Sequence, residues 1–104
     1  MQITVNEYQE YRAAGGEAVL LDVRTLEEFE IVRLEGALLV TRDLLKEILE
    51  DWPRDRALIT YCHHGVRSLE AAKFLASRGF GNVRSLSGGI DAWATDIDPS
   101  LPRY

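Results

Sequence analysis

Apolar residues follow two alternating patterns along this chain: short uninterrupted runs, and stretches with helical spacing. The uninterrupted runs have the length of strands and leave no polar face, which is typical of strands buried in a parallel sheet. We expect a short strand at Ile3 and further strands at 18–23, 37–40, 57–61 and 82–86.

Helical patterns fill the gaps between these runs. Thr4 with Glu7, and Thr25 with Glu28, have the spacing of a capping box, which predicts helix starts at both places. The expected helices extend to about Ala14 and over 26–30, 42–50, about 68–78 and from 89 to at least 93. Strands that alternate with helices predict an α/β fold whose parallel sheet is covered on both faces.

Length and composition restrict the function further. A chain of 104 residues is expected to form one domain over 1–104, and its net charge of −5 with no basic patch argues against nucleic acid as a partner. No apolar run approaches the roughly 20 residues of a membrane span, and residues 1–7 do not resemble a signal peptide. One cysteine excludes an intramolecular disulfide and fits a reducing compartment, so we expect a cytoplasmic protein.

That single cysteine, Cys62, lies between the expected strand 57–61 and the helix that follows it. A helix N-terminus offers unpaired N–H groups and a partial positive charge, and Arg67 is close in sequence. Such surroundings lower the pKa of a thiol from about 8.5 towards about 3.5–7.5. We therefore expect a reactive thiolate at the carboxyl end of a strand, where open α/β sheets bind ligands.

The residues that follow Cys62 predict a binding loop. If the segment 62–68 curls around the sulfur, its backbone N–H groups form a nest that binds an anion, such as a persulfide on the cysteine. Gly65 suits a tight reversal because glycine adopts a positive φ at little cost. Arg67 is expected to add positive charge near the rim.

Two histidines follow the cysteine, and each has several candidate roles. His63 and His64 could bind zinc, but adjacent residues rarely point at one ion and no second cysteine completes a closed site. Either could act as a general base, which a thiolate already stabilised by the loop does not need. We expect both to be exposed rim residues that tune the local potential, and we expect neither a metal nor a cofactor.

Four segments in order resemble the signatures of the rhodanese family, and together they cover nearly the whole chain. They are 21–24 with 27–29, 34–37, the loop 62–68, and 88–90 with Trp93. One departure lies in the second signature, where many members have histidine and proline and this chain has Arg33 and Glu35. Leu34 and Gly36 keep the apolar turn there, so we expect the fold to be preserved.

The resemblance implies an open α/β fold with a five-stranded parallel sheet and a sulfurtransferase activity. Cys62 would attack the outer sulfur of thiosulfate or another sulfane donor and then pass it to cyanide, a thiol or a protein. The expected substrate-binding residues are those of the loop: His63, His64, Gly65, Val66, Arg67 and Ser68.

Four further residues are expected to support this site. Asp22 and Arg24 follow a different strand, where they could be catalytic but more simply join neighbouring loops through hydrogen bonds and an ion pair. Gly88 and Gly89 would allow the backbone to approach the Cys62 loop closely.

Two other functions remain open from the sequence. A cysteine phosphatase or arsenate reductase also closes its loop with an arginine, but with one more residue than the spacing from Cys62 to Arg67 allows. That shorter loop suits a single sulfur atom better than a tetrahedral oxyanion. The other alternative is a binding or regulatory module without catalysis, which loss of the cysteine would favour.

Overall fold

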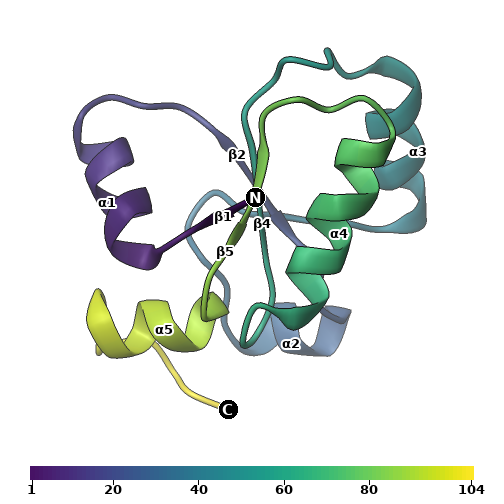
Figure 1. The fold of residues 1–104 in the computed structure, drawn as a ribbon. Helices are drawn as coiled ribbons and strands as arrows, with labels where there is room; N and C mark the ends of the chain where they lie inside the picture. The colour runs from purple at the N-terminus through teal and green to yellow at the C-terminus, as the bar shows by residue number, and fades with distance from the viewer.

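The computed structural model describes residues 1–104 and contains a five-stranded parallel sheet with helices on both faces (Figure 1). This confirms the predicted α/β class. The strands are β1 (Gln2–Ile3), β2 (Val19–Asp22), β3 (Leu38–Leu39), β4 (Leu58–Tyr61) and β5 (Val83–Leu86). Their order, β1-β5-β4-β2-β3, places β4 in the middle of the sheet. The residue after the central strand is Cys62.

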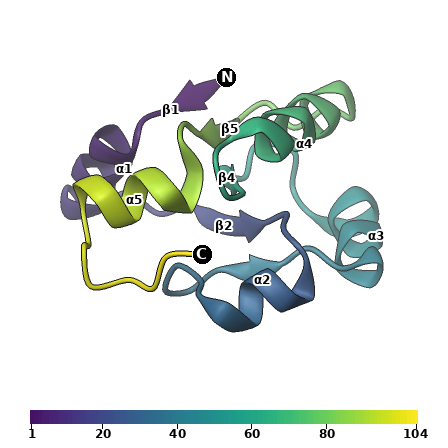
Figure 2. The ribbon, with the colours of Figure 1, turned by 90° about the horizontal axis from the view of Figure 1, so that it is seen from below.

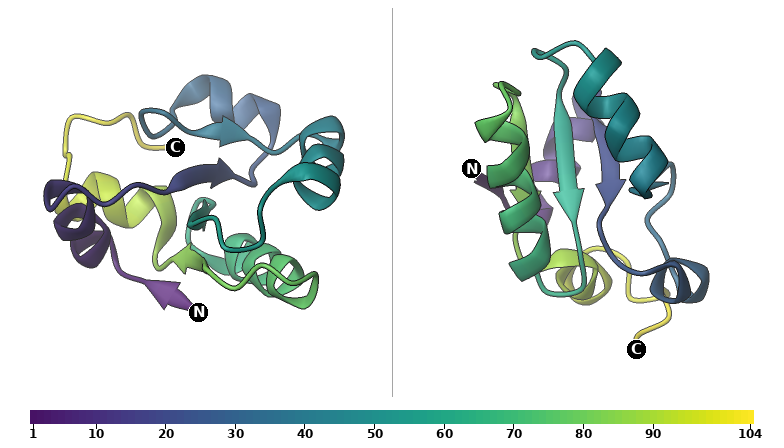
Figure 3. Two further views of the ribbon diagram at one scale, coloured as in Figure 1. Left: turned by 90° about the horizontal axis from the view of Figure 1, so that it is seen from above. Right: turned by 90° about the vertical axis from the view of Figure 1, so that its right-hand side faces the viewer.

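Helices cover the sheet in pairs (Figures 1 and 3). Helices α1 (Val5–Ala13) and α5 (Gly89–Asp96) lie on one face, and α3 (Arg42–Asp51) and α4 (Val66–Ser77) lie on the other. Helix α2 (Leu26–Ile31) lies at the carboxyl ends of the strands (Figure 2). None of these helices combines the length and the apolar composition that a membrane crossing requires.

Both predicted capping boxes are present. The Thr4 hydroxyl accepts from the Glu7 N–H at the start of α1, and the Glu7 carboxylate accepts from the Thr4 N–H. Thr25 and Glu28 form the same pair at the start of α2. Each pair satisfies two backbone donors that a helix start leaves open, which fixes where the helix begins.

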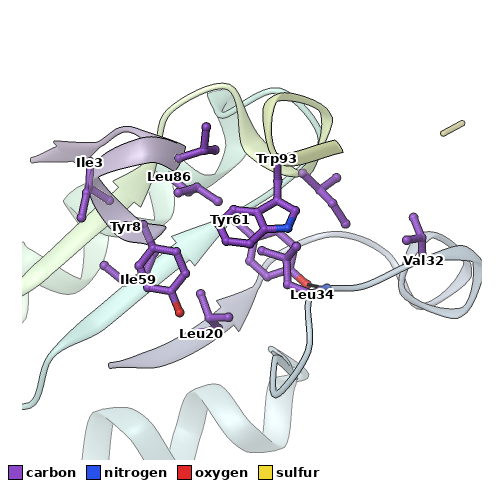
Figure 4. Close-up of a cluster of buried hydrophobic side chains, with 11 residues drawn as sticks. Ile3, Tyr8, Leu20, Val32, Leu34, Ile59, Tyr61, Leu86 and Trp93 are labelled. Atoms are coloured by element: carbon purple, nitrogen blue, oxygen red, sulfur yellow. Dashed lines mark hydrogen bonds between the residues drawn. The ribbon is translucent and has the colours of Figure 1, made fainter. Parts of the chain in front are cut away.

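The side chains of each central strand alternate between two separate cores. Leu20 and Ile59 point to the face covered by α1 and α5, whereas Leu21 and Leu58 point to the face covered by α3 and α4. The first core also contains Tyr61, which lies close to Leu34 (Figure 4). Because β2 and β4 are buried on both faces, their sequences are almost entirely apolar.

Two predicted boundaries were wrong. The run 37–40 yields only the two-residue strand β3, whose residues are exposed or half-buried because β3 is an edge strand. Helix α4 begins at Val66, two residues before the predicted start, because Gly65 in a left-handed conformation already ends the loop.

Candidate active site

The loop after β4 is a tight turn of four residues, 62–65, that leads directly into α4. Gly65 has φ +101°, a conformation that costs glycine little and other residues considerably more. This reversal brings the first turn of α4 back over the end of β4. The sulfur of Cys62 therefore lies beneath the helix N-terminus, and the residue is only 1% exposed.

Backbone and side-chain hydrogen bonds surround this sulfur. Cys62 Sγ accepts from the N–H of Gly65 at 3.1 Å and from the N–H of Ser68 at 3.3 Å. The Ser68 hydroxyl lies 3.4 Å from Sγ, where it accepts from the thiol and can donate to the thiolate. This arrangement is the nest that the loop sequence predicts.

Two opposing effects act on the pKa of Cys62. Burial raises the pKa of the thiol, but hydrogen bonds from the Ser68 side chain and from the N–H groups of Ser68, Gly65 and Arg67 outweigh it. The net result is a pKa below the usual value of a cysteine. These donors favour the thiolate, the form that acts as a nucleophile.

Residues of β4 and β5 hold Ser68 in place. Its hydroxyl lies 2.7 Å from the hydroxyl of Ser85 in β5, and its carbonyl accepts from the Thr60 hydroxyl of β4 at 2.8 Å. All three residues are fully buried. Sequence reasoning missed Thr60 and Ser85 as parts of the site; the only signal was one small hydroxyl residue in each of the strands β4 and β5.

The start of α5 presses against the other side of the loop. The N–H of Ile90 donates to the carbonyl of Cys62, and the N–H of Asp91 donates to the carbonyl of His63. A Cβ atom on Gly89 would overlap both carbonyl oxygens. Gly89 thus permits the close approach, whereas a Cβ on Gly88 would overlap the Ala92 side chain of α5 and not the loop.

The expected pair of Asp22 and Arg24 is present and buried. Arg24 Nη2 lies 2.6 Å from Asp22 Oδ2, and both side chains are completely buried. Arg24 also donates to the carbonyl of Val32 and, through Nη1, to the hydroxyl of Tyr104 at 2.8 Å. Burial opposes its charge, but the bonds to Asp22 and Tyr104 outweigh this and raise the pKa of Arg24. The pair connects the end of β2 to two other segments.

Arg67 lies at the rim of the loop, where its side chain is paired with α2. Its guanidinium donates two hydrogen bonds to the carboxylate of Glu28 in α2, at 2.8 and 3.1 Å. The positive charge at the rim is therefore balanced by a carboxylate and is not free. Val66 is 74% exposed and makes no hydrogen bond to the sulfur.

The two histidines lie at the rim. Their rings stack at 4.1 Å, and the His63 ring also stacks on Tyr104 at 4.2 Å. Burial, together with repulsion from His64, lowers the pKa of His63. His64 Nε2 lies 3.8 Å from a carboxylate oxygen of Asp91.

These two histidines and Asp91 are the only group whose ligand atoms are close enough to suggest a metal site, with all three atoms within 4.8 Å of one another. The imidazole planes of His63 and His64 are almost parallel, at 11°. The lone pair of each ring nitrogen lies in its own ring plane, so the two lone pairs do not point at one ion. Asp91 is also paired with Arg103 at 2.7 Å. As arranged, the three residues do not form a coordination site.

The altered second signature packs as the apolar turn predicts. Leu34 is buried, and its N–H donates to the hydroxyl of Tyr61. Arg33 lies over the ring of Phe29, with its guanidinium carbon 4.5 Å from the ring centroid. The arginine that replaces the usual histidine therefore covers α2 from outside the core.

Comparison with known proteins gives the same family as the sequence motifs. The family model described as the rhodanese-like domain matches residues 4–96. This chain belongs to the rhodanese-like domain family. A human single-domain sulfurtransferase, TSTD1, superposes with a TM-score of 0.78 at 25% identity, covering 91% of this chain and 96% of the human one.

Curated relatives of this rhodanese-like domain include both short and long proteins. The thiosulfate sulfurtransferase GlpE of Actinobacillus succinogenes is 41% identical over 73% of this chain and 68% of its own length. The probable adenylyltransferase/sulfurtransferase MoeZ of Mycobacterium tuberculosis is 38% identical over 98% of this chain. The chain spans only about a quarter of MoeZ, 26% of its length.

Proposed function

We propose that this rhodanese-like domain is a sulfurtransferase that carries one sulfane sulfur as a persulfide on Cys62. The observation that supports this most strongly is the set of donors around Cys62 Sγ. Two backbone N–H groups and a buried hydroxyl converge on one sulfur atom. A nest of this size stabilises a thiolate and the negative charge on a sulfur bonded to it.

The first half-reaction forms a new sulfur–sulfur bond. The Cys62 thiolate attacks the outer sulfur of thiosulfate or another sulfane donor, and the donor's own S–S bond breaks. With thiosulfate the leaving group is sulfite, which departs with the bonding electron pair, and Cys62 becomes a persulfide anion. This exchange of one sulfur–sulfur bond for another needs no external oxidant or reductant.

The second half-reaction restores the thiolate. A nucleophilic acceptor, such as cyanide, a thiol or a protein, attacks the terminal sulfur of the persulfide. The Cys62–sulfur bond breaks, and its electron pair returns to Cys62. Two steps through one covalent intermediate predict ping-pong kinetics.

The remaining residues have supporting roles in this proposal. Residues 63–68 form the cradle: Gly65 and Ser68 donate to the sulfur, while His63, His64, Val66 and Arg67 surround its rim. Asp22, Arg24, Gly88 and Gly89 hold the neighbouring segments around the cradle. The relatives' names support the class of activity, since GlpE is called a thiosulfate sulfurtransferase and MoeZ a probable adenylyltransferase/sulfurtransferase.

Mass spectrometry tests the proposal directly. After incubation with thiosulfate, intact wild-type protein is expected to gain the mass of one sulfur atom, and peptide mapping should locate it on Cys62. A reducing thiol or cyanide should remove it. Cys62→Ser should gain nothing and turn over no substrate. Wild type with an intact thiol that forms no persulfide with any sulfane donor would contradict the proposal and favour a binding module.

The phosphatase alternative has its own readout in the same preparation. Hydrolysis of para-nitrophenyl phosphate that is lost in Cys62→Ser would favour a phosphatase. We expect no such hydrolysis, because the spacing from Cys62 to Arg67 makes a loop suited to one sulfur atom.

A further inference from the structure

The C-terminal segment 102–104 runs across the carboxyl edge of the sheet. It follows α5 and ends between the Cys62 loop and α2, as two perpendicular views show (Figures 2 and 3). Residues of this segment line a small space together with His63 and the start of α5. The segment therefore lies beside the Cys62 loop at the carboxyl ends of the strands, the edge at which open α/β sheets bind their ligands.

Tyr104 makes contacts with three separate elements at this edge. Its hydroxyl accepts from Arg24 Nη1 at 2.8 Å, in the loop after β2, and donates to Glu28 Oε2 at 2.8 Å, in α2. Its ring stacks on His63 of the Cys62 loop, with centroids 4.2 Å apart and planes at 22°. One side chain thus spans the gap between the Cys62 loop and α2.

A second anchor lies one residue earlier. Arg103 Nη2 is 2.7 Å from Asp91 Oδ1 in α5. No backbone hydrogen bond connects residues 102–104 to the rest of the molecule, so side chains alone hold the segment in place. Tyr104 is 40% exposed, whereas Cys62 beneath the loop is 1% exposed. A segment held only by a few partly exposed side-chain contacts can open locally without unfolding the domain.

We propose that Tyr104 is a specificity-determining residue that limits the size of the molecules reaching Cys62. While its hydroxyl bridges Arg24 and Glu28, the ring narrows the approach to the loop and admits only small sulfur compounds. A bulky donor or acceptor reaches the sulfur only after the phenol has left both partners. The identity of the excluded substrates rests on the proposed function. The test of this inference does not, because it measures only access to the thiol.

The open fraction of the segment controls the rate for bulky reagents. Both bonds of the hydroxyl involve a charged partner, and such bonds are stronger than those between neutral groups. Removing the hydroxyl should raise the open fraction, and a reagent that needs the open state reacts faster in the same proportion. A small reagent that reaches Cys62 while the segment is closed should react at nearly the same rate in the variant as in wild type.

Alkylation of Cys62 by maleimides of increasing size tests this proposal. N-methyl-, N-phenyl- and N-pyrenylmaleimide share one reacting group and differ in bulk, and Cys62 is their only thiol target. In Tyr104→Phe we expect the rate with the pyrenyl reagent to rise about tenfold and that with the methyl reagent to change much less. Tyr104→Ala, which also loses the stacking on His63, should raise the pyrenyl rate further.

A matched control removes a tyrosine hydroxyl elsewhere. Tyr11 donates to the carbonyl of Glu17, away from the carboxyl edge, so Tyr11→Phe should keep the wild-type rates. An unchanged ratio of methyl to pyrenyl rates in Tyr104→Phe and in folded Tyr104→Ala would overturn the proposal. Alkylation needs only the thiolate, so a protein that forms no persulfide but shows this size dependence would contradict the proposed function and leave the role of Tyr104 intact.

Discussion

Arg67 directs its guanidinium at Glu28 in α2 and not at the sulfur of Cys62. Nη1 lies 2.8 Å from Oε1 and Nη2 lies 3.1 Å from Oε2, which joins the cysteine loop to α2. The bond from Arg67 is the largest effect on the Glu28 carboxyl and holds its pKa well below the usual value. The loop therefore depends on its own N–H groups and on Ser68 to stabilise the thiolate.

Replacing Arg67 tests this division of roles. Arg67→Met should lower the free energy of unfolding by only about 0.5 kcal/mol, because the Arg67 side chain is 46% exposed and water screens the pair. The pH midpoint of Cys62 alkylation should stay close to that of wild type. A large rise in that midpoint would show that the guanidinium itself stabilises the thiolate.

Ser68 is expected to control the pH dependence of the thiol. Burial raises the pKa of Cys62, and the Ser68 side chain is the largest of the effects that lower it. In Ser68→Ala the alkylation rate should therefore begin to rise at higher pH than in wild type. At neutral pH we expect the rate with iodoacetamide to fall about tenfold, since a hydrogen bond to a charged group is lost.

A serine elsewhere on the same helix provides the control for that measurement. Ser77 lies at the end of α4, exposed, with its hydroxyl donating to the carbonyl of Phe74. Ser77→Ala should keep the wild-type pH profile. Identical profiles for Ser68→Ala and wild type would contradict the assigned role of the hydroxyl.

Gly89 should tolerate no side chain. A Cβ there would overlap the carbonyl oxygens of Cys62 and His63, and φ +62° is unfavourable for other residues. Gly89→Ala should lower the free energy of unfolding by about 2 kcal/mol or more, as measured by urea denaturation. Gly81→Ala is the control, because a Cβ at Gly81 meets nothing within 4 Å.

Tyr61 should contribute to stability through its hydroxyl. Both residues are buried, and the hydroxyl accepts from the N–H of Leu34, so its removal would leave a buried N–H without a partner. Tyr61→Phe should therefore cost about 1–2 kcal/mol in the free energy of unfolding. Tyr11→Phe, whose hydroxyl bond is at the surface, should cost much less. Equal small effects in both variants would show that the Leu34 N–H does not need its partner.

The sequence predicted most of the fold because its signals are local. Capping boxes at Thr4 and Thr25 depend on residues three apart, and the apolar runs of β2 and β4 show directly that these strands are buried on both faces. The same reasoning failed for β3. An apolar run at 37–40 does not reveal that its strand lies at the edge of the sheet, because strand order is a property of the whole chain.

The site divides in the same way. Cys62 at a turn from strand to helix, and Gly65 as the residue that permits the turn, follow from neighbouring residues. The partners of Ser68 do not. Ser85 is 17 residues away and reaches Ser68 only because β5 lies next to β4 in the sheet.

By itself the sequence determined most of the elements and the family and singled out Cys62 as the candidate nucleophile, since each depends on short-range patterns or on the identity of one residue. Only the tertiary structure decided what surrounds the mouth of the loop. Glu28 balances the charge of Arg67 from 39 residues away, and Tyr104 reaches Glu28 across 76 residues. Distant segments meet at the carboxyl edge of the sheet, and this meeting decides which charges are paired and which side chain covers the approach to the loop. No local sequence pattern encodes it.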